Sequence, residues 1–253
     1  MTSTILVTGG TGTLGRRVTP LLLDAGFKVR LLSRSSHQSG DGIEYVTGDL
    51  LKGEGVDAAV DGAEIVLHLA GGPKGDDVAT RNLAEAAARA GVRHLVYISV
   101  IGADRVPLAW LKSKLDAEKA IAESGVPWTT LRAAQFNELT FTMVEKMAKL
   151  PVTPAPGGLR LQPVDSRDVA ARLVELVQGE PAGLVPDLAG PKVYGMVELV
   201  QGVLAAQGKR NRPKLPVRIP GKAGKAYRAG DNLTLDAPKG AHTWESFLAD
   251  RQN

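Results

Sequence analysis

The chain has 253 residues, 43% of them hydrophobic, which is enough for one sizeable α/β domain or two small ones. It has no cysteine, which excludes disulfides, thiolate metal sites and a cysteine nucleophile. Its four histidines are scattered, so we expect no metal site. The 31 basic and 27 acidic residues leave a net charge of +4, which is too small to indicate nucleic-acid binding.

The first residues carry no charged leader, no long apolar segment and no small-residue cleavage site before the first apolar strand begins. We therefore expect a cytoplasmic protein with no membrane association. The sequence does not decide between a monomer and a homodimer.

Residues 5–18 begin as an apolar run, break into glycines and then continue with helical spacing, which predicts a strand, a tight turn and a helix. Gly9, Gly12 and Gly15 lie three residues apart, so the chain can turn sharply and bring its backbone against a pyrophosphate. This spacing differs from the usual GxGxxG. The position directly after the first strand is what supports a dinucleotide site.

The next predicted strand, residues 28–32, ends at Arg34, which is flanked by serines. An acidic side chain at this place would bind the ribose hydroxyls of NAD, whereas an arginine accommodates the 2′-phosphate of NADP. We expect NADP(H). The alternative is that Arg34 is a solvated loop charge.

Strand and helix signals alternate through the first 150 residues and predict an α/β fold, a doubly wound parallel sheet of the Rossmann type. Residues 1–150 are expected to form the NADP-binding domain. Residues 151–253 are expected to form a small substrate-side region that completes the same compact unit. The predicted elements are strands at 43–47, 64–70 and 94–100 and helices at 14–25, 76–90 and 107–125.

In open α/β sheets, ligands bind at the carboxyl ends of the strands. Asp49 follows one strand and could accept a hydrogen bond from an adenine amino group, or it could be an ordinary loop carboxylate. Gly71 follows another and would let a flat cofactor approach. His68 lies in the middle of its strand and is expected to be a core histidine.

Two segments after residue 149 differ in composition from the rest of the chain. Residues 150–158 are rich in proline and end in two glycines, which favours a stiff and then flexible flap. Residues 209–228 hold eight basic side chains. They are expected to form a solvated loop, or to steer an anionic cofactor or substrate.

Several of these motifs together resemble the NmrA-like group of atypical short-chain dehydrogenases. The resemblance rests on Thr8-Gly9-Gly10-Thr11-Gly12-x-x-Gly15, Ser33-Arg34, Gly48-Asp49-Leu50, Tyr97-Ile98-Ser99 and Lys114, and it continues in residues 126–132, 162–170 and 189–199. It covers nearly the whole chain. The group includes quinone and carbonyl reductases, epimerases, and regulators that bind NADP without turning it over.

The resemblance implies that Ser99 orients a substrate oxygen and that Lys114 holds the nicotinamide ribose. The group's tyrosine, four residues before the lysine, is Trp110 here, and an indole cannot serve as a general acid. The expected cofactor-binding residues are Gly9, Thr11, Gly12, Thr13, Leu14, Gly15, Arg34, Asp49, Leu50, Ala70, Gly71 and Lys114.

Trp110, Gln135, Phe136 and Asn137 are the expected substrate-binding residues, because the segment after residue 132 combines apolar side chains with a few polar ones. That segment could equally be a helix that only packs on the domain. Tyr194, Tyr227 and Asp104 are conceivable proton donors, although each is more easily explained as structural.

The expected function is NADPH-dependent reduction of a small hydrophobic carbonyl, enone or quinone by hydride transfer without the usual tyrosine. Two alternatives stay open. One is a non-catalytic NADP(H)-binding regulator that senses redox state, which the tryptophan at position 110 favours. The other is a non-redox epimerase or cyclase on the same fold.

Overall fold

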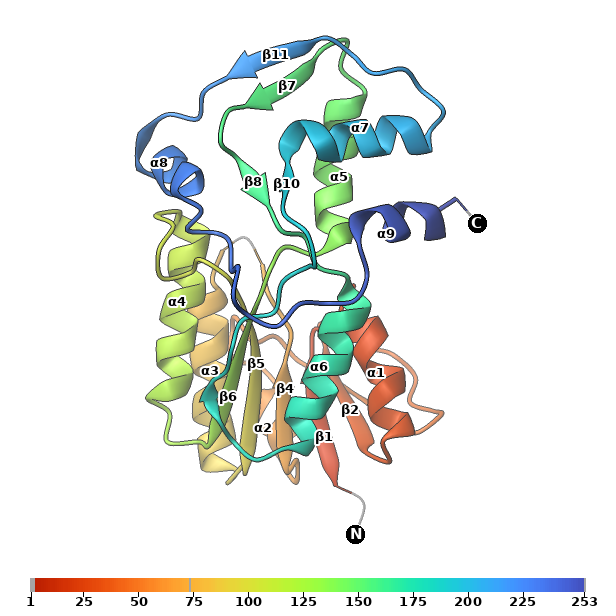
Figure 1. The fold of residues 1–253 in the computed structure, drawn as a ribbon. Helices are drawn as coiled ribbons and strands as arrows, with labels where there is room; N and C mark the ends of the chain where they lie inside the picture. The colour runs from red at the N-terminus through yellow and green to blue at the C-terminus, as the bar shows by residue number, and fades with distance from the viewer. Residues whose placement is uncertain (1–2, 73, 253) are drawn as a thin grey trace. The chain divides into compact units, whose positions relative to one another are not determined.

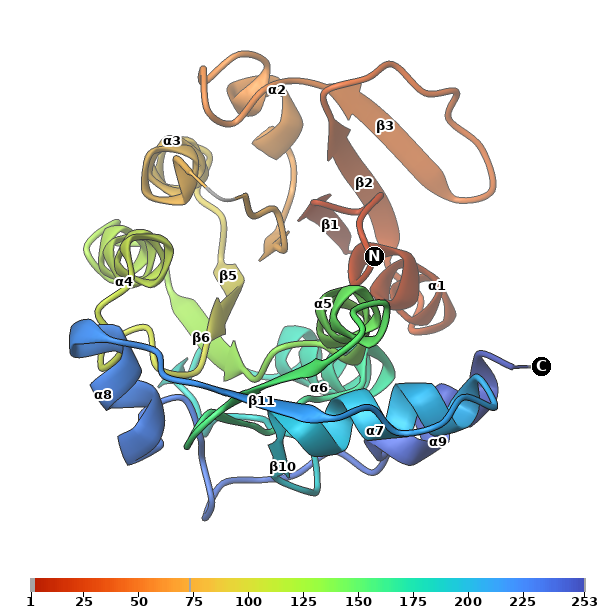
Figure 2. The ribbon, with the colours of Figure 1, turned by 90° about the horizontal axis from the view of Figure 1, so that it is seen from above.

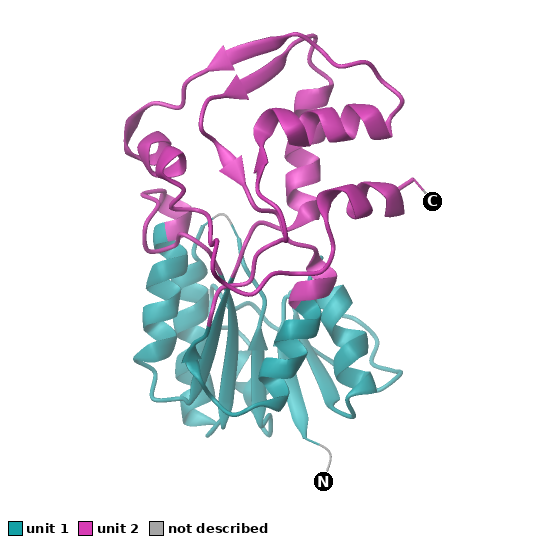
Figure 3. Ribbon diagram, viewed as in Figure 1, with its two compact units in different colours: residues 1–99, 112–132, 170–185 teal, residues 100–111, 133–169, 186–253 magenta. Residues whose placement is uncertain are grey.

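The computed structural model describes residues 3–72 and 74–252 (Figure 1). The chain forms two compact units (Figure 3). Unit 1 comprises residues 1–99, 112–132 and 170–185, and unit 2 comprises residues 100–111, 133–169 and 186–253. The units interleave along the sequence, because the chain leaves unit 1 three times, after Ser99, Arg132 and Val185. The sequence predicts a single boundary, after residue 150. The roles expected for residues 1–150 and 151–253 stay predictions.

Unit 1 is built on a seven-stranded sheet in the order β3-β2-β1-β4-β5-β6-β9. The strands are β1 (Thr4–Thr8), β2 (Lys28–Ser33), β3 (Ile43–Thr47), β4 (Ile65–His68), β5 (His94–Val100), β6 (Trp128–Ala133) and β9 (Gly183–Leu184). β1 pairs in parallel with both β2 and β4, so the order reverses direction at β1. This order confirms the predicted Rossmann fold.

Helices cover both faces of the sheet in unit 1 (Figure 2). α2 (Val56–Val60), α3 (Asp76–Arg89) and α4 (Ala109–Ala122) lie on one face, and α1 (Gly15–Asp24) and α6 (Ser166–Gln178) lie on the other. Ala84, Ala86 and Ala87 of α3 are buried with Leu6, Val66 and Leu95 of the sheet. Such small residues let a helix pack closely on a sheet.

Unit 2 has a second core, formed by α5 (Asn137–Ala148), α7 (Met196–Ala206) and α9 (Trp244–Asp250). Two small ladders accompany these helices. β7 (Thr153–Pro156) pairs with β11 (Lys214–Val217) in parallel, and β8 (Arg160–Leu161) pairs with β10 (Tyr194–Gly195) in antiparallel orientation. α8 (Gly221–Ala229) lies between β11 and α9 in the chain.

The loop expected at residues 209–228 is wrong, and the flap expected at residues 150–158 stays a prediction. Residues 150–158 contain β7, and residues 209–228 contain β11 and α8. Pro154 and Pro156 of β7 cannot donate to a ladder, which is why the sequence favours a loop. The pairing with β11 supplies partners for the backbone that the local sequence does not reveal.

α4 begins two residues later than the proline at position 107 suggests. Gly102 adopts a φ of 86°, and its carbonyl accepts a hydrogen bond from Val106 N at 2.9 Å. Leu108 N then donates to Val106 O at 2.8 Å. This turn occupies the Val106 carbonyl, which a helix starting at Pro107 would use for its first backbone hydrogen bond. The helix therefore begins at Ala109.

His68 is a core histidine, as the sequence predicts, with 1% of its surface exposed. Its Nδ1 lies 2.6 Å from Thr8 Oγ1, and its Nε2 lies 2.9 Å from Thr80 Oγ1. Burial, and secondly the charge of Lys114, lowers the pKa of His68 from 6.5 to about 3. The imidazole is therefore neutral in the folded protein.

Because His68 is buried in its neutral form, the free energy of unfolding depends on pH below pH 6.5. The unfolded chain binds a proton at this side chain below pH 6.5, whereas the folded protein does so only near pH 3. The free energy of unfolding should therefore fall as the pH drops from 6.5 towards 3, with His68 contributing about 1.4 kcal/mol per pH unit. Urea denaturation of wild type and His68→Gln between pH 7 and 4 checks this. An equally steep fall in the variant would contradict it.

Within residues 3–72 and 74–252, no helix combines the length and the apolar composition needed to cross a membrane.

Candidate functional site

The turn between β1 and α1 depends on its glycines. Gly9 has a φ of 71°, and a Cβ there would lie 2.6 Å from Ala70 N at the end of β4. A Cβ on Gly15 would overlap the Cα of Gly10. Gly12 N donates to Gly9 O at 3.0 Å and closes the turn. The glycines thus allow a tight turn at the carboxyl end of β1.

The start of α1 has the features of an anion site. Leu14 occupies the N-cap and supplies no capping hydrogen bond. In the described part of the chain, the N–H groups of Thr13 and Leu14 have no hydrogen-bond acceptor. Thr11, Gly12 and Thr13 are exposed. Open N–H groups and the positive end of a helix dipole suit a pyrophosphate.

Arg34 is exposed at the end of β2, and no carboxylate pairs with it among the described residues. The turn that carries it is fixed by Ser33, whose Oγ accepts from Ser35 N at 3.2 Å and lies 3.1 Å from His37 Nε2. The backbone that carries Arg34 is therefore held in a defined turn, and the exposed guanidinium is available for an anion.

Asp49 closes its own loop. Its Oδ1 accepts hydrogen bonds from Leu51 N at 2.9 Å and from Lys52 N at 3.4 Å. Asn82 of α3 donates to Leu50 O at 2.7 Å and ties this loop to the sheet domain. The structure thus gives Asp49 a local role, and contact of Asp49 and Leu50 with an adenine stays a prediction.

Lys114 reaches the carboxyl end of β4. Its Nζ lies 2.9 Å from Asp76 Oδ2 and donates to the hydroxyl of Tyr97 at 3.3 Å. A Cβ on Gly71 would lie 3.0 Å from this Nζ, so the ammonium sits directly against the glycine backbone. Asp76 also accepts from Gly72 N at 2.6 Å. The sequence predicts Lys114 and Gly71, and the structure brings them together.

Asp76 and Tyr97 both orient the lysine, although neither is predicted as a site residue from the sequence. An acidic residue at the start of the helix that follows Gly71 is the signal that could have identified Asp76. Burial, and then the charges of Asp76 and Glu118, raises the pKa of Tyr97 well above its ordinary value. Tyr97 therefore stays protonated and can accept a hydrogen bond from the charged lysine.

Ser99 is buried and its hydroxyl donates to Glu118 Oε1. Glu118 is held in turn by Arg132, with Nε to Oε1 at 2.9 Å and Nη2 to Oε2 at 2.7 Å. The Ser99 proton is thus committed to a carboxylate of the same unit, and only the serine oxygen can accept a further hydrogen bond. A role of Ser99 towards substrate stays a prediction.

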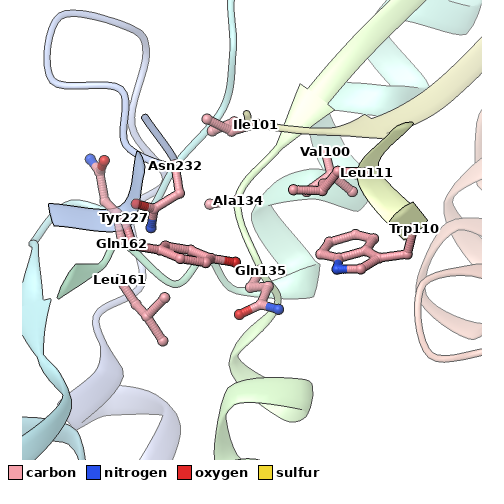
Figure 4. Close-up of a pocket in the computed structure, with 10 residues that line it drawn as sticks. All are labelled: Val100, Ile101, Trp110, Leu111, Ala134, Gln135, Leu161, Gln162, Tyr227 and Asn232. Carbon is pink, nitrogen blue, oxygen red and sulfur yellow. The ribbon is translucent and has the colours of Figure 1, made fainter. Parts of the chain in front are cut away.

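Unit 2 contains a small pocket with a volume of about 30 Å³ (Figure 4). Apolar and polar groups contribute almost equally to its lining. The lining residues are Val100, Ile101, Trp110, Leu111, Ala134, Gln135, Leu161, Gln162, Tyr227 and Asn232.

The pocket brings together two of the four predicted substrate residues, Trp110 and Gln135. Phe136 and Asn137 are not among its lining residues. Asn137 is fully buried because it begins α5, where its backbone N donates to Val164 O and its side chain lies 3.5 Å from Asp165. The lining residues Gln162 and Asn232 were not predicted, because they lie far along the chain from Trp110.

The other conceivable donors have partners of their own. The Tyr194 hydroxyl donates to Glu245 Oε2 at 2.6 Å, and burial together with this carboxylate raises the pKa of Tyr194. Asp104 lies 3.6 Å from Arg105 Nε. Tyr227 is the one that lines the pocket.

Several curated proteins are similar in sequence. A Streptomyces griseus (4-alkanoyl-5-oxo-2,5-dihydrofuran-3-yl)methyl phosphate reductase is 35% identical over 181 residues, which is 69% of this chain and 63% of that protein. Quinone oxidoreductase 2 of Escherichia coli is 26% identical over 81% of this chain and 75% of its own length. The chain spans less than two thirds of the Streptomyces relative, and only 54% of a chloroplastic protein from Arabidopsis thaliana.

Solved structures share the fold. An NADPH-dependent quinone oxidoreductase from Escherichia coli, solved with NADPH, matches with a TM-score of 0.84 at 20% identity, over 98% of this chain and 100% of that one. A Citrobacter triphenylmethane reductase complexed with NADP(H) matches with a TM-score of 0.78 at 21% identity, over 96% and 98% of the two chains.

The match to a protein family covers the β1 turn and most of the sheet. It extends over residues 9–180 and identifies a family described as NAD(P)H-binding. This agrees with the glycine turn, the open start of α1 and the resemblance to the NmrA-like group. The chain belongs to the NAD(P)H-binding family.

Proposed function

We propose that this protein is an NADP(H)-dependent oxidoreductase that reduces a hydrophobic carbonyl, enone or quinone. The observation that carries the proposal is the uncapped glycine turn before α1, together with an Arg34 that has no ion-pair partner among the described residues. The apolar side chains of the unit 2 pocket, among them Trp110 and Leu111, support a hydrophobic substrate. Relatives named as reductases support the reaction type.

NADPH would supply a hydride from its nicotinamide ring. The N–H groups of Thr13 and Leu14 would bind the pyrophosphate, and Arg34 would pair with the 2′-phosphate. Gly71 presents bare backbone to a flat ring, and Lys114 beside it carries the ammonium that would hold the ribose hydroxyls. Asp76 and Tyr97 fix where that ammonium points.

The cofactor preference is testable at Arg34. We expect Arg34→Ala to weaken NADPH binding by about 10- to 100-fold, because a charge-assisted contact to phosphate is lost, and to leave NADH binding unchanged. Isothermal titration of the purified protein with both cofactors measures this. Arg89→Ala is the matched control, since Arg89 is an exposed arginine that pairs with Asp57 on the surface.

Equal weakening of NADPH binding and NADH binding would show that Arg34 does not recognise the 2′-phosphate. Absence of binding to either one would overturn the proposed function. Consumption of NADPH with a quinone, an enone and a ketone then tests turnover.

A second function is favoured by Trp110 and by the Ser99 hydroxyl, which donates to Glu118. We infer, as the alternative, a non-catalytic NADP(H)-binding regulator that senses redox state. It requires different affinities for NADP⁺ and NADPH, because a pair of ligands bound equally can shift no equilibrium. Equal affinities, or turnover of any substrate, would exclude it. A cytoplasmic location stays a prediction for either function.

A further inference from the structure

Residues 209–228 of unit 2 carry a concentration of positive charge that the rest of the chain does not balance. The segment has no acidic residue, and its eight basic side chains are Lys209, Arg210, Arg212, Lys214, Arg218, Lys222, Lys225 and Arg228. All of them except Arg212 are exposed. The net charge of the whole chain is only +4, so acidic residues outnumber basic ones outside this segment. We call these eight side chains the basic surface.

The basic surface has no counterions within the protein. Elsewhere in the chain, basic side chains such as Arg30 and Arg89 pair with carboxylates. Within residues 3–72 and 74–252, none of the eight side chains of the basic surface forms an ion pair. Exposed cations that lack partners of their own attract an anionic partner from solution.

The fold presents these charges outward. The segment runs from the end of α7 along β11 and into α8 (Figure 2). Lys222, Lys225 and Arg228 lie three residues apart in α8, and therefore share one helix face. Gly224 and Ala226 of the same helix are buried. The inner face of α8 thus packs on unit 2, and its outer face is basic.

Exposed apolar side chains lie among the charges. Leu215 and Val217 of β11 are 52% and 42% exposed, and they share one face of the strand. The β7 residues beside them in register are Pro154 and Pro156. Thr153, on the opposite face of β7, is 2% exposed, because β7 packs against α7. The solvent-facing side of this ladder is therefore apolar and flanked by cations.

A peptide strand is a poor partner for the free edge of β11. The carbonyls of Pro213 and Val217 accept hydrogen bonds from Thr153 N and Gly157 N, on the side of β7. Alternate residues of a strand face the same neighbour, so Pro216 faces the other edge, where it offers no N–H. Proline and charged residues are typical of strand edges that resist pairing.

Nucleic acid also fits less well. Proteins that bind single strands stack bases on aromatic side chains. Tyr227 is the one aromatic residue of the segment, and it packs against the apolar cluster of Val106, Leu111 and Ala226. Exposed aliphatic side chains between the cations contribute nothing to a contact with phosphates, whereas they do contribute to a contact with lipid.

We propose that the basic surface, with Leu215 and Val217, is a docking site for a bilayer that contains anionic phospholipids. The cations attract the head groups, and the two aliphatic side chains enter the boundary between head groups and acyl chains. The sequence predicts no membrane association because it lacks a leader and a long apolar segment. Docking at the bilayer surface requires neither, and it is independent of the proposed function.

Vesicle sedimentation tests the charges. The full chain should bind mixed vesicles of phosphatidylcholine and phosphatidylserine at low salt, bind pure phosphatidylcholine vesicles far more weakly, and dissociate at about 0.5 M NaCl. Replacing four basic residues with glutamine should weaken binding about 100-fold or more, since each contributes about 5-fold. The changes are Arg210→Gln, Lys214→Gln, Arg218→Gln and Lys222→Gln.

The matched control removes four exposed lysines outside the basic surface and should leave vesicle binding within about 3-fold of wild type, because only the overall charge changes. It combines Lys28→Gln, Lys52→Gln, Lys146→Gln and Lys239→Gln. Equal weakening by the two sets would show that net charge alone attracts the protein. That result, or absence of binding by the wild type, would overturn the proposal.

The apolar side chains distinguish a bilayer from other polyanions. Leu215→Ser with Val217→Ser should weaken vesicle binding by about 10-fold, because less apolar surface enters the lipid, and leave binding of duplex DNA unchanged. Leu184→Ser with Leu235→Ser is the control, since these residues are 51% and 59% exposed elsewhere. If the Leu215 and Val217 variant binds vesicles as tightly as wild type, the surface is a general polyanion site and the bilayer proposal fails.

Discussion

Replacing Glu118 with alanine is expected to lower the free energy of unfolding by about 3–5 kcal/mol. Glu118 and Arg132 form a bidentate ion pair whose side chains are only 11% and 10% exposed, and Glu118 also accepts from the buried Ser99. The alanine variant would leave the guanidinium buried without this carboxylate and the serine hydroxyl without its acceptor. Both groups are costly to desolvate. Urea denaturation of the purified variant measures the loss.

Two controls separate burial from ion pairing as such. Asp57→Ala removes the Arg89 pair, whose side chains are 61% and 74% exposed, and should cost no more than about 1 kcal/mol. The double variant Glu118→Met with Arg132→Met replaces both charges by apolar groups and should recover part of the loss. A loss below about 1 kcal/mol for Glu118→Ala would contradict the expected role.

Gly9→Ala is expected to lower the free energy of unfolding by about 2–5 kcal/mol and to abolish measurable NADPH binding. The alanine would be strained at a φ of 71°, and its Cβ would lie 2.6 Å from Ala70 N. That nitrogen belongs to the backbone at the end of β4, so the contact can be relieved only by moving the turn or the strand. Either shift displaces the N–H groups of Thr13 and Leu14. Thermal unfolding and cofactor titration measure the two effects.

Gly62→Ala is the matched control for this change. Gly62 has a φ of 68°, close to that of Gly9, but no atom lies within 4 Å of the position of an added Cβ. It should therefore cost only the left-handed backbone strain, about 1–2 kcal/mol, and leave NADPH binding intact. Equal losses for the two variants would mean that the close approach to β4 contributes nothing.

The strands of the sheet could be located from the sequence because their signals are local. β3 and β5 have the bounds expected for them, since an alternating pattern and a continuous apolar run each define a strand without reference to the rest of the chain. The parallel Rossmann sheet followed from the alternation of strands and helices. The glycine spacing likewise predicted the turn after β1, because backbone conformation at φ > 0 is itself a local property.

Segments whose structure depends on distant partners could not be located in this way. β7 contains two prolines and looks like a loop, yet it pairs with β11 some sixty residues later in the chain. The pocket of unit 2 shows the same limit. Trp110 and Gln135 could be proposed from their neighbourhood in the sequence, whereas Gln162 and Asn232 line the same cavity from segments far along the chain.

The Rossmann sheet, the glycine turn and the NAD(P)H class of cofactor could be predicted from the sequence, because each depends on periodicity or on backbone freedom within a few residues. The partners of the polar side chains at the candidate site became known from the tertiary fold alone. It paired Lys114 with Asp76 and Glu118 with Arg132, and it committed the Ser99 proton to Glu118. The physical reason is that buried polar groups must find hydrogen-bond partners wherever the fold brings complementary groups within reach, irrespective of their separation along the chain.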